Sequence, residues 1–219
     1  MMMRKKPMLA YPVSDKPIDY NNTVFMQPKL DGVRCLIQYE KVKPTGIPPD
    51  IYSHQVKAYS RTGKEWKNID HILQSLRPFF ESNPDVILDG ELYNHALRDD
   101  FEKIISCVRK TKPTAIDRTE SRKLVQFHCY DIVDETIPFV DRIHWLNKEF
   151  QRFPYGVRLV PTESVLDDRD AELYHDYQLS QGYEGSILRL NDVYQCKRSH
   201  SLRKFKDFHD TEATIIGFV

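Results

Sequence analysis

The hexapeptide Lys29-Leu30-Asp31-Gly32-Val33-Arg34 decides how this sequence is interpreted. It follows the apolar segment 24–28, which we expect to be a strand, and its Asp-Gly pair predicts a sharp turn directly after the lysine. A lysine held at such a place can act as a nucleophile when burial or nearby positive charge favours its neutral amine. A solvated hairpin uses the same turn residues, so the hexapeptide alone leaves both interpretations open.

Four more charged motifs follow along the chain, each on an apolar or aromatic segment. They are Asp89-Gly90-Glu91-Leu92, Phe127-His128-Cys129-Tyr130-Asp131, Glu184-Gly185-Ser186-Ile187-Leu188 and Lys204-Phe205-Lys206. On a strand, Lys204 and Lys206 would share one face while Phe205 packs on the other, and two cations on one face suit a phosphate. A solvated edge strand with protective lysines is the alternative for this pattern.

The order and spacing of these motifs resemble the nucleotidyltransferase core shared by ATP-dependent DNA ligases, RNA ligases and mRNA capping enzymes, over nearly the whole chain. The resemblance implies an α+β fold of antiparallel sheets flanked by helices, an ATP-grasp-like ligase catalytic core. It also implies that Lys29 attacks the α-phosphorus of ATP with loss of pyrophosphate. Lys204 and Lys206 match the family lysines that contact the α-phosphate.

Two carboxylates are candidate ligands for Mg²⁺, which proteins usually hold through one or two carboxylates together with phosphate and water. Glu184 precedes an apolar strand and stands beside a glycine that would let backbone approach a ligand. Without the neighbouring motifs it would be interpreted as an exposed turn residue. Glu91 follows the buried segment 86–88, and the resemblance implies that it faces the ribose and supports the metal. Asp89 is expected to order the turn, as Asp-Gly pairs do.

Recognition of adenine needs an aromatic face and hydrogen bonds from backbone. Tyr130 occupies the position of the family's base-stacking aromatic ring, whereas Phe127 should point to the opposite face of its strand and fill the core. The backbone around Gln27 is expected to contact the base. Segment 7–10 resembles the one that closes one side of the pocket in ligases.

Two arginines complete the expected set. Arg34 holds the family place that reaches the nucleotide sugar or the nick, and Arg61, in Ser60-Arg61-Thr62-Gly63, matches the next ligase motif, whose arginine meets phosphate. A guanidinium group makes paired hydrogen bonds to phosphate oxygens, although a plain surface role is the default for either residue.

Composition permits this interpretation without suggesting it. The 219 residues include 32 basic and 32 acidic ones, so a phosphate-binding surface must come from local segregation of charge. The four cysteines form no CxxC pair, which argues against a zinc finger or a disulfide framework. We see no signal peptide or membrane span and expect an intracellular, cytoplasmic monomer of bacterial or viral origin.

Hydrophobic periodicity predicts helices over about 69–80, 99–109, 141–153 and 168–181, the last one closed by Gly182. Strands are expected at 24–28, 33–39, 56–60, 86–88, 124–133 and 157–160, with two or three more near the end. Residues 43–50 form a proline-rich loop in this scheme. The polar stretch Lys110–Lys123 is expected to be a mobile loop.

We assign residues 1–210 to an adenylation domain and 211–219 to the start of an oligonucleotide-binding barrel that is otherwise essentially absent. Full sealing should then be weak while the nucleotide pocket still forms. This tail and the Glu184-Gly185 motif favour an ATP-dependent DNA ligase acting on nicked duplex DNA. The 28 residues before Lys29 are too few for an NAD-binding domain. The alternatives are an RNA ligase, a capping guanylyltransferase that uses GTP, and a nonenzymatic nucleic-acid-binding module.

Overall fold

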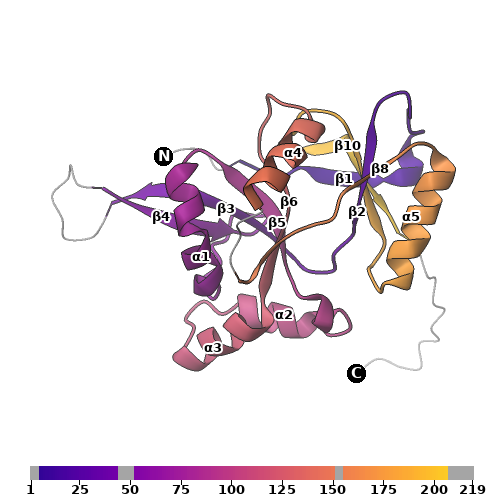
Figure 1. Ribbon diagram of the computed structural model, residues 1–219. Helices are drawn as coiled ribbons and strands as arrows, with labels where there is room; N and C mark the ends of the chain where they lie inside the picture. The colour runs from indigo at the N-terminus through magenta and orange to yellow at the C-terminus, as the bar shows by residue number, and fades with distance from the viewer. Residues whose placement is uncertain (1–4, 44–51, 151–154, 207–219) are drawn as a thin grey trace, which may run out of the picture.

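A computed structural model describes residues 5–43, 52–150 and 155–206 (Figure 1). Two five-stranded sheets form its framework. Sheet A has the strand order β1-β10-β9-β2-β8, and sheet B has the order β4-β3-β5-β6-β7. The strands of sheet A are β1 (Leu9–Pro12), β2 (Val24–Pro28), β8 (Glu163–Val165), β9 (Ser186–Leu190) and β10 (Arg198–Phe205). Those of sheet B are β3 (Val33–Val42), β4 (Ser53–Tyr59), β5 (Ile87–Tyr93), β6 (Gln126–Ile132) and β7 (Val157–Leu159).

The helices cover the sheets from outside. α1 (Asp70–Ser82), α2 (Phe101–Val108), α3 (Ala115–Leu124) and α4 (Phe139–Glu149) surround sheet B, and α5 (Asp168–Ser180) lies along sheet A (Figure 1). Two short 3-10 turns, η1 (Val13–Asp15) and η2 (His95–Leu97), complete the described elements. The α+β class predicted from the sequence is confirmed, and no closed barrel occurs among the residues described here.

Each sheet has its own apolar core. Ile37, Leu88 and Phe127 of sheet B pack with Ile72 of α1 and Ile104 of α2, all at most 1% exposed. A smaller core joins sheet A to α5. Phe25 of β2 in sheet A also packs in the larger core, so apolar contacts connect the two sheets.

Most strand pairs are antiparallel, as expected, but β1 pairs with β10 and β6 pairs with β7 in parallel. The pairing of β1 makes segment 7–10 part of sheet A. The chain passes from one sheet to the other at residues 29–32, because β2 belongs to sheet A and β3 to sheet B. The lysine turn is therefore one of two places where the described chain passes between the sheets, the other being the segment between β7 and β8.

The prediction of a mobile loop at Lys110–Lys123 is wrong, because α3 occupies most of that stretch. The Thr114 hydroxyl accepts a hydrogen bond from the Asp117 N–H at 3.2 Å, and the Asp117 carboxylate accepts one from the Thr114 N–H at 2.8 Å. This capping box satisfies amide groups that would otherwise lack partners at the helix start. Asn68 then holds α3 in place by donating to the carbonyls of Cys107 and Asp117.

The other helices agree with their predicted spans to within a few residues. Gly182 ends α5 with a φ of +82°, as its position suggested. The predicted loop 44–50, the end of the predicted helix 141–153 and the barrel strand at 211–219 lie outside the described residues.

Candidate active site

Most of the candidate residues gather around one cavity of about 320 Å³ between the two sheets. Its wall combines residues of β2, β9 and β10 from sheet A with residues of β3, β5 and β6 from sheet B. The predicted site residues in this wall are Gln27, Lys29, Arg34, Arg61, Glu91, Tyr130 and Lys204. Leu9 and Ala10 close one side, which agrees with the expectation for segment 7–10.

Backbone hydrogen bonds fix Lys29 beside the Glu184-Gly185 motif. The Lys29 N–H donates to the carbonyl of Gly185 at 2.9 Å, and the Glu184 N–H donates to the carbonyl of Lys29 at 3.3 Å. Gly185 has a φ of +145°, and a Cβ atom there would lie 2.4 Å from the carbonyl oxygen of Phe205. Only glycine fits, so the motif sets Glu184 against the lysine by backbone geometry.

The side chains of Lys29 and Glu184 form an ion pair, and Lys206 approaches the same carboxylate at 3.6 Å. Burial and the charge of Glu184 raise the pKa of the neighbouring Asp31 carboxyl. Phe205 stacks on His175 with ring centres 3.9 Å apart, while Lys204 lies in the cavity wall. Lys204 faces the cavity and the Phe205 ring packs against the smaller core, whereas Lys206 follows the end of β10 and is not among the residues that line the cavity.

Glu91 lies within β5 instead of following it, and its cross-strand neighbour on β3 is Arg34. Its carboxylate accepts a hydrogen bond from the Tyr130 hydroxyl at 3.3 Å. Burial, partly offset by Arg34, raises the pKa of Glu91 to about 7. A Cβ atom on Gly32 would meet the Glu91 side chain at 2.7 Å, so the lysine turn rests directly on this residue.

The Tyr130 ring lies in the cavity wall between two guanidinium groups. The central carbons of Arg34 and Arg189 are 5.1 and 5.4 Å from the ring centre, within the range of cation–π attraction. Phe127 is fully buried in the core, as predicted. Arg189 was not recognised as a site residue, although it directly follows the Glu184-Gly185-Ser186-Ile187-Leu188 motif.

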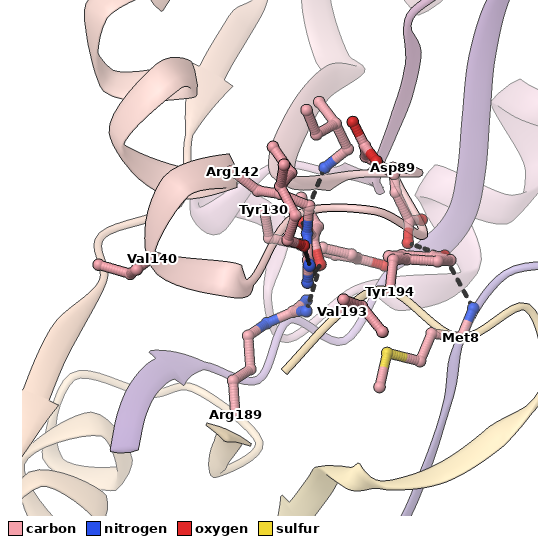
Figure 2. Close-up of polar contacts among 12 residues, drawn as sticks. Met8, Asp89, Tyr130, Val140, Arg142, Arg189, Val193 and Tyr194 are labelled. Carbon is pink, nitrogen blue, oxygen red and sulfur yellow. Dashed lines mark hydrogen bonds and ion pairs between the residues drawn. The ribbon is translucent and has the colours of Figure 1, made fainter. Parts of the chain in front are cut away.

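Asp89 does not order a turn, which corrects the sequence prediction. It is a fully buried residue of β5 whose carboxylate accepts hydrogen bonds from Arg34 at 2.6 and 2.5 Å. The Tyr194 hydroxyl donates to the same carboxylate and accepts from the Met8 N–H, both at 2.7 Å (Figure 2). Arg34 also donates to the Met8 carbonyl at 3.1 Å, so these four residues form a closed ring that fastens the start of β1 to sheet B.

A second buried network lies behind Tyr130 (Figure 2). Asp131 accepts hydrogen bonds from Arg142 at 2.7 and 3.2 Å and from Arg189 at 2.7 Å. Arg189 also donates to the Gln27 side chain at 2.7 Å, and Gln27 donates to the Tyr130 carbonyl at 3.1 Å. The side chain of Gln27 therefore binds the backbone of β6 at Tyr130. The sequence suggested only that the backbone near Gln27 contacts the base.

No group of three or more carboxylate, histidine or cysteine side chains suited to a metal occurs in the described part of the chain. Mg²⁺ nonetheless needs only one or two carboxylates when phosphate oxygens and water complete its shell. Glu184, whose side chain is 29% exposed beside the lysines, fits that requirement. Within the described residues, no helix is long and apolar enough to cross a membrane.

Comparisons with known proteins agree with this geometry. The family model for the ATP dependent DNA ligase domain matches residues 7–206, and the chain belongs to that family. Its fold is similar to a solved Lig E DNA ligase, with a TM-score of 0.71 and 20% identity over 94% of this chain and 70% of that one. A search of curated protein sequences gave no match.

Two viral enzymes share the fold as well. A Chlorella virus DNA ligase-adenylate gives a TM-score of 0.63 and 21% identity, covering 92% of this chain and 67% of that one. The ATP-dependent DNA ligase from bacteriophage T7, solved in complex with ATP, gives 0.62 and 18%, covering 92% and 68%. The chain spans only 46% of another solved protein that it matches, so the activity of a whole ligase is a proposal for it.

Proposed function

We propose that this adenylation domain forms a covalent lysyl-AMP at Lys29 and passes the AMP to the 5′-phosphate of nicked duplex DNA. The observation that carries the proposal is the cavity that Lys29, Lys204 and the aromatic Tyr130 all line. Its volume of about 320 Å³ is at the lower end of the range for small-molecule sites.

The first step joins the Lys29 nitrogen to the α-phosphorus of ATP and expels pyrophosphate. Negative charge spreads over phosphoryl oxygens in the transition state, so positioning and cations supply most of the catalysis. Lys204 and Lys206 provide that charge. Lys29 must first leave the Glu184 carboxylate and lose one proton, because an ammonium group has no electron pair with which to attack.

Glu184, supported by Glu91, would hold Mg²⁺ together with the triphosphate. The bound ion would neutralise phosphate charge and favour departure of pyrophosphate. Tyr130 would stack on adenine, and its guanidinium neighbours would keep the ring in place. Arg34 would serve mainly as the support of this wall, because Asp89 and the Met8 carbonyl already take hydrogen bonds from its Nε and Nη2 atoms.

In the second step an oxygen of the DNA 5′-phosphate attacks the adenylate phosphorus and the bond to Lys29 breaks. The neighbouring 3′-hydroxyl then attacks the activated phosphate, and AMP leaves as the backbone is sealed. Arg61 would contact phosphate on this substrate.

Mass spectrometry of the intact protein after incubation with ATP and Mg²⁺ tests the first step. Wild type should gain one AMP, and Lys29→Ala and Lys29→Arg should gain none, while both still bind ATP. Charge alone cannot restore the reaction, which needs a neutral amine. An acid-labile AMP adduct in either variant would place the nucleophile elsewhere, and a wild-type preference for GTP would favour a capping enzyme.

A further inference from the structure

A group of side-chain contacts joins the two halves of the protein directly after β5. His95 lies in η2, two residues past the end of β5, and its Nε2 atom is 3.1 Å from the carbonyl oxygen of Gln181, which follows α5. The His95 ring also packs against the ring of Tyr183, between α5 and β9, with the ring centres 4.4 Å apart. We refer to Tyr93, His95, Gln181 and Tyr183 as the His95 bridge, because they connect sheet B to the segment that leads into β9 of sheet A.

The partners of His95 determine which of its ring nitrogens donates. A carbonyl oxygen only accepts hydrogen bonds, so Nε2 donates to Gln181. In the neutral ring Nδ1 then accepts, and its partner is the Tyr93 hydroxyl at 2.7 Å. Burial raises the pKa of Tyr93, so the hydroxyl keeps the proton that it donates. Because both ring nitrogens have a partner, the orientation of the imidazole is fixed from both sides.

The His95 bridge completes a closed loop of contacts around the lysine turn. Tyr93 packs beneath this turn, since a Cβ atom on Gly32 would lie 3.2 Å from the Tyr93 Cβ atom. From Tyr93 the contacts pass through His95 to the residue that directly precedes Glu184. The Glu184 N–H donates to the carbonyl of Lys29, which returns the loop to the turn.

The two carboxylates proposed to hold Mg²⁺ come from opposite ends of this bridge. Glu91 lies on β5, four residues before His95, whereas Glu184 directly follows Tyr183. The bridge therefore ties the chain just after one carboxylate to the chain just before the other. Mg²⁺ requires nearly ideal octahedral geometry with short bonds, so its binding is sensitive to the spacing of its ligands.

We propose that His95 is a positioning residue for lysyl-AMP formation, because its hydrogen bond to Gln181 holds Glu184 at the separation from Glu91 that a magnesium–ATP complex requires. His95 does not line the nucleotide cavity, so it acts through Glu184 and makes no contact with ATP. The inference rests on the proposed function, since the metal concerned is the one used in that reaction.

The test compares His95→Asn with the conservative variant His95→Gln. The asparagine side chain is too short to reach Gln181, whereas the side-chain amide of glutamine can donate from about the place of Nε2. His71→Asn is the matched control, because Nε2 of this half-buried histidine of α1 lies 3.0 Å from the carbonyl oxygen of Val125, away from the bridge. Urea unfolding first establishes that each variant is folded.

Three quantities are then measured: the rate of lysyl-AMP formation over a Mg²⁺ titration, ATP binding without Mg²⁺, and amide hydrogen exchange of the peptide spanning 179–186 in the free protein. His95→Asn should raise the Mg²⁺ concentration for half-maximal rate about 2- to 10-fold, the scale of one lost hydrogen bond. It should also speed exchange in this peptide and leave ATP binding unchanged. His95→Gln should recover most of both losses, and His71→Asn should show neither.

Tyr183→Ala disturbs the same bridge from the other side. Combined with His95→Asn, it should shift the Mg²⁺ dependence by less than the sum of the two single effects, because both changes act on one contact. Full additivity would contradict a shared role.

The outcomes separate the inference from the proposed function. A wild-type protein that forms no lysyl-AMP overturns the proposed function and the inference with it. If wild type forms the adduct, the inference alone is overturned when His95→Asn keeps the wild-type Mg²⁺ dependence, when His95→Gln is as impaired as His95→Asn, or when His71→Asn shifts the Mg²⁺ dependence equally. Weaker ATP binding without Mg²⁺ in His95→Asn would also overturn it, because His95 would then support the nucleotide pocket and not the metal.

Discussion

Replacement of Asp131 by asparagine tests whether the network behind Tyr130 holds the site together. Asp131 is fully buried, and its two partners Arg142 and Arg189 have side chains only 2% and 4% exposed. Removing the charge leaves two buried guanidinium groups around a neutral amide. Removing one partner of a buried ion pair costs about 3–5 kcal/mol of folding stability. We expect a value within that range although two arginines are affected, because Arg142 also donates hydrogen bonds to the carbonyls of Ile137 and Asp192 and keeps these partners.

We therefore expect Asp131→Asn to lower the free energy of unfolding by about 3–5 kcal/mol, which for a domain of this size corresponds to a Tm lower by roughly 6–20 °C. Urea unfolding followed by circular dichroism measures it. Glu135→Gln is the control, because it removes the partner of an exposed ion pair with Lys5 and should leave the free energy of unfolding close to the wild-type value. A loss below about 1 kcal/mol in Asp131→Asn, with the slope against urea unchanged, would refute the reasoning.

Three further results are expected. Glu184→Ala should slow lysyl-AMP formation by orders of magnitude across a Mg²⁺ titration without unfolding the chain, and wild-type rates would remove this residue from the metal site. Tyr130→Ala should weaken ATP binding by roughly 1–3 kcal/mol in calorimetry and keep the preference over GTP, whereas Tyr130→Phe should bind like wild type. Burial raises the pKa of Glu91 to about 7, so ionisation of Glu91 makes the folded protein less stable as pH rises from about 4.5 to 7. Burial and the positive charge of Arg158 lower the pKa of His128 to about 4, so protonation of His128 makes the folded protein less stable as pH falls from about 6.5 to 4. Between pH 4 and 7, Glu91→Gln should therefore gain more stability with rising pH than wild type does, because the variant lacks the opposing effect of Glu91, and identical profiles in urea denaturation would contradict the raised pKa of Glu91.

The lysine turn and the Lys204-Phe205-Lys206 motif could be interpreted from sequence because their geometry is local. Alternation on a strand fixes which side chains share a face, and a turn follows from Asp-Gly. The role of Asp89 could not be deduced in that way, because its partners Arg34 and Tyr194 come from distant strands and loops. Its Asp-Gly neighbourhood indicated a turn, but pairing of β5 with two other strands overrides that local preference.

α3 was missed for a different reason. Its polar composition resembles a loop, and its few apolar residues give little periodicity. The signal that could have revealed it is the Thr114-x-x-Asp117 pattern, which the structure uses as a capping box.

The crossing of the chain at residues 29–32 has a mechanical consequence. Lys204, expected to contact phosphate, and Glu184, expected to hold Mg²⁺, belong to sheet A or its strand ends, whereas Tyr130 and Glu91 belong to sheet B. A bound nucleotide would therefore connect the two sheets, with its base held by residues of sheet B and its phosphates by residues of sheet A, in addition to the buried hydrogen bonds that already join Arg189 to Asp131 and Gln27 to Tyr130. Lys29 lies in the turn that connects the two sheets. A rotation of one sheet relative to the other would therefore change the distance between the Lys29 amine and the α-phosphorus of a bound nucleotide.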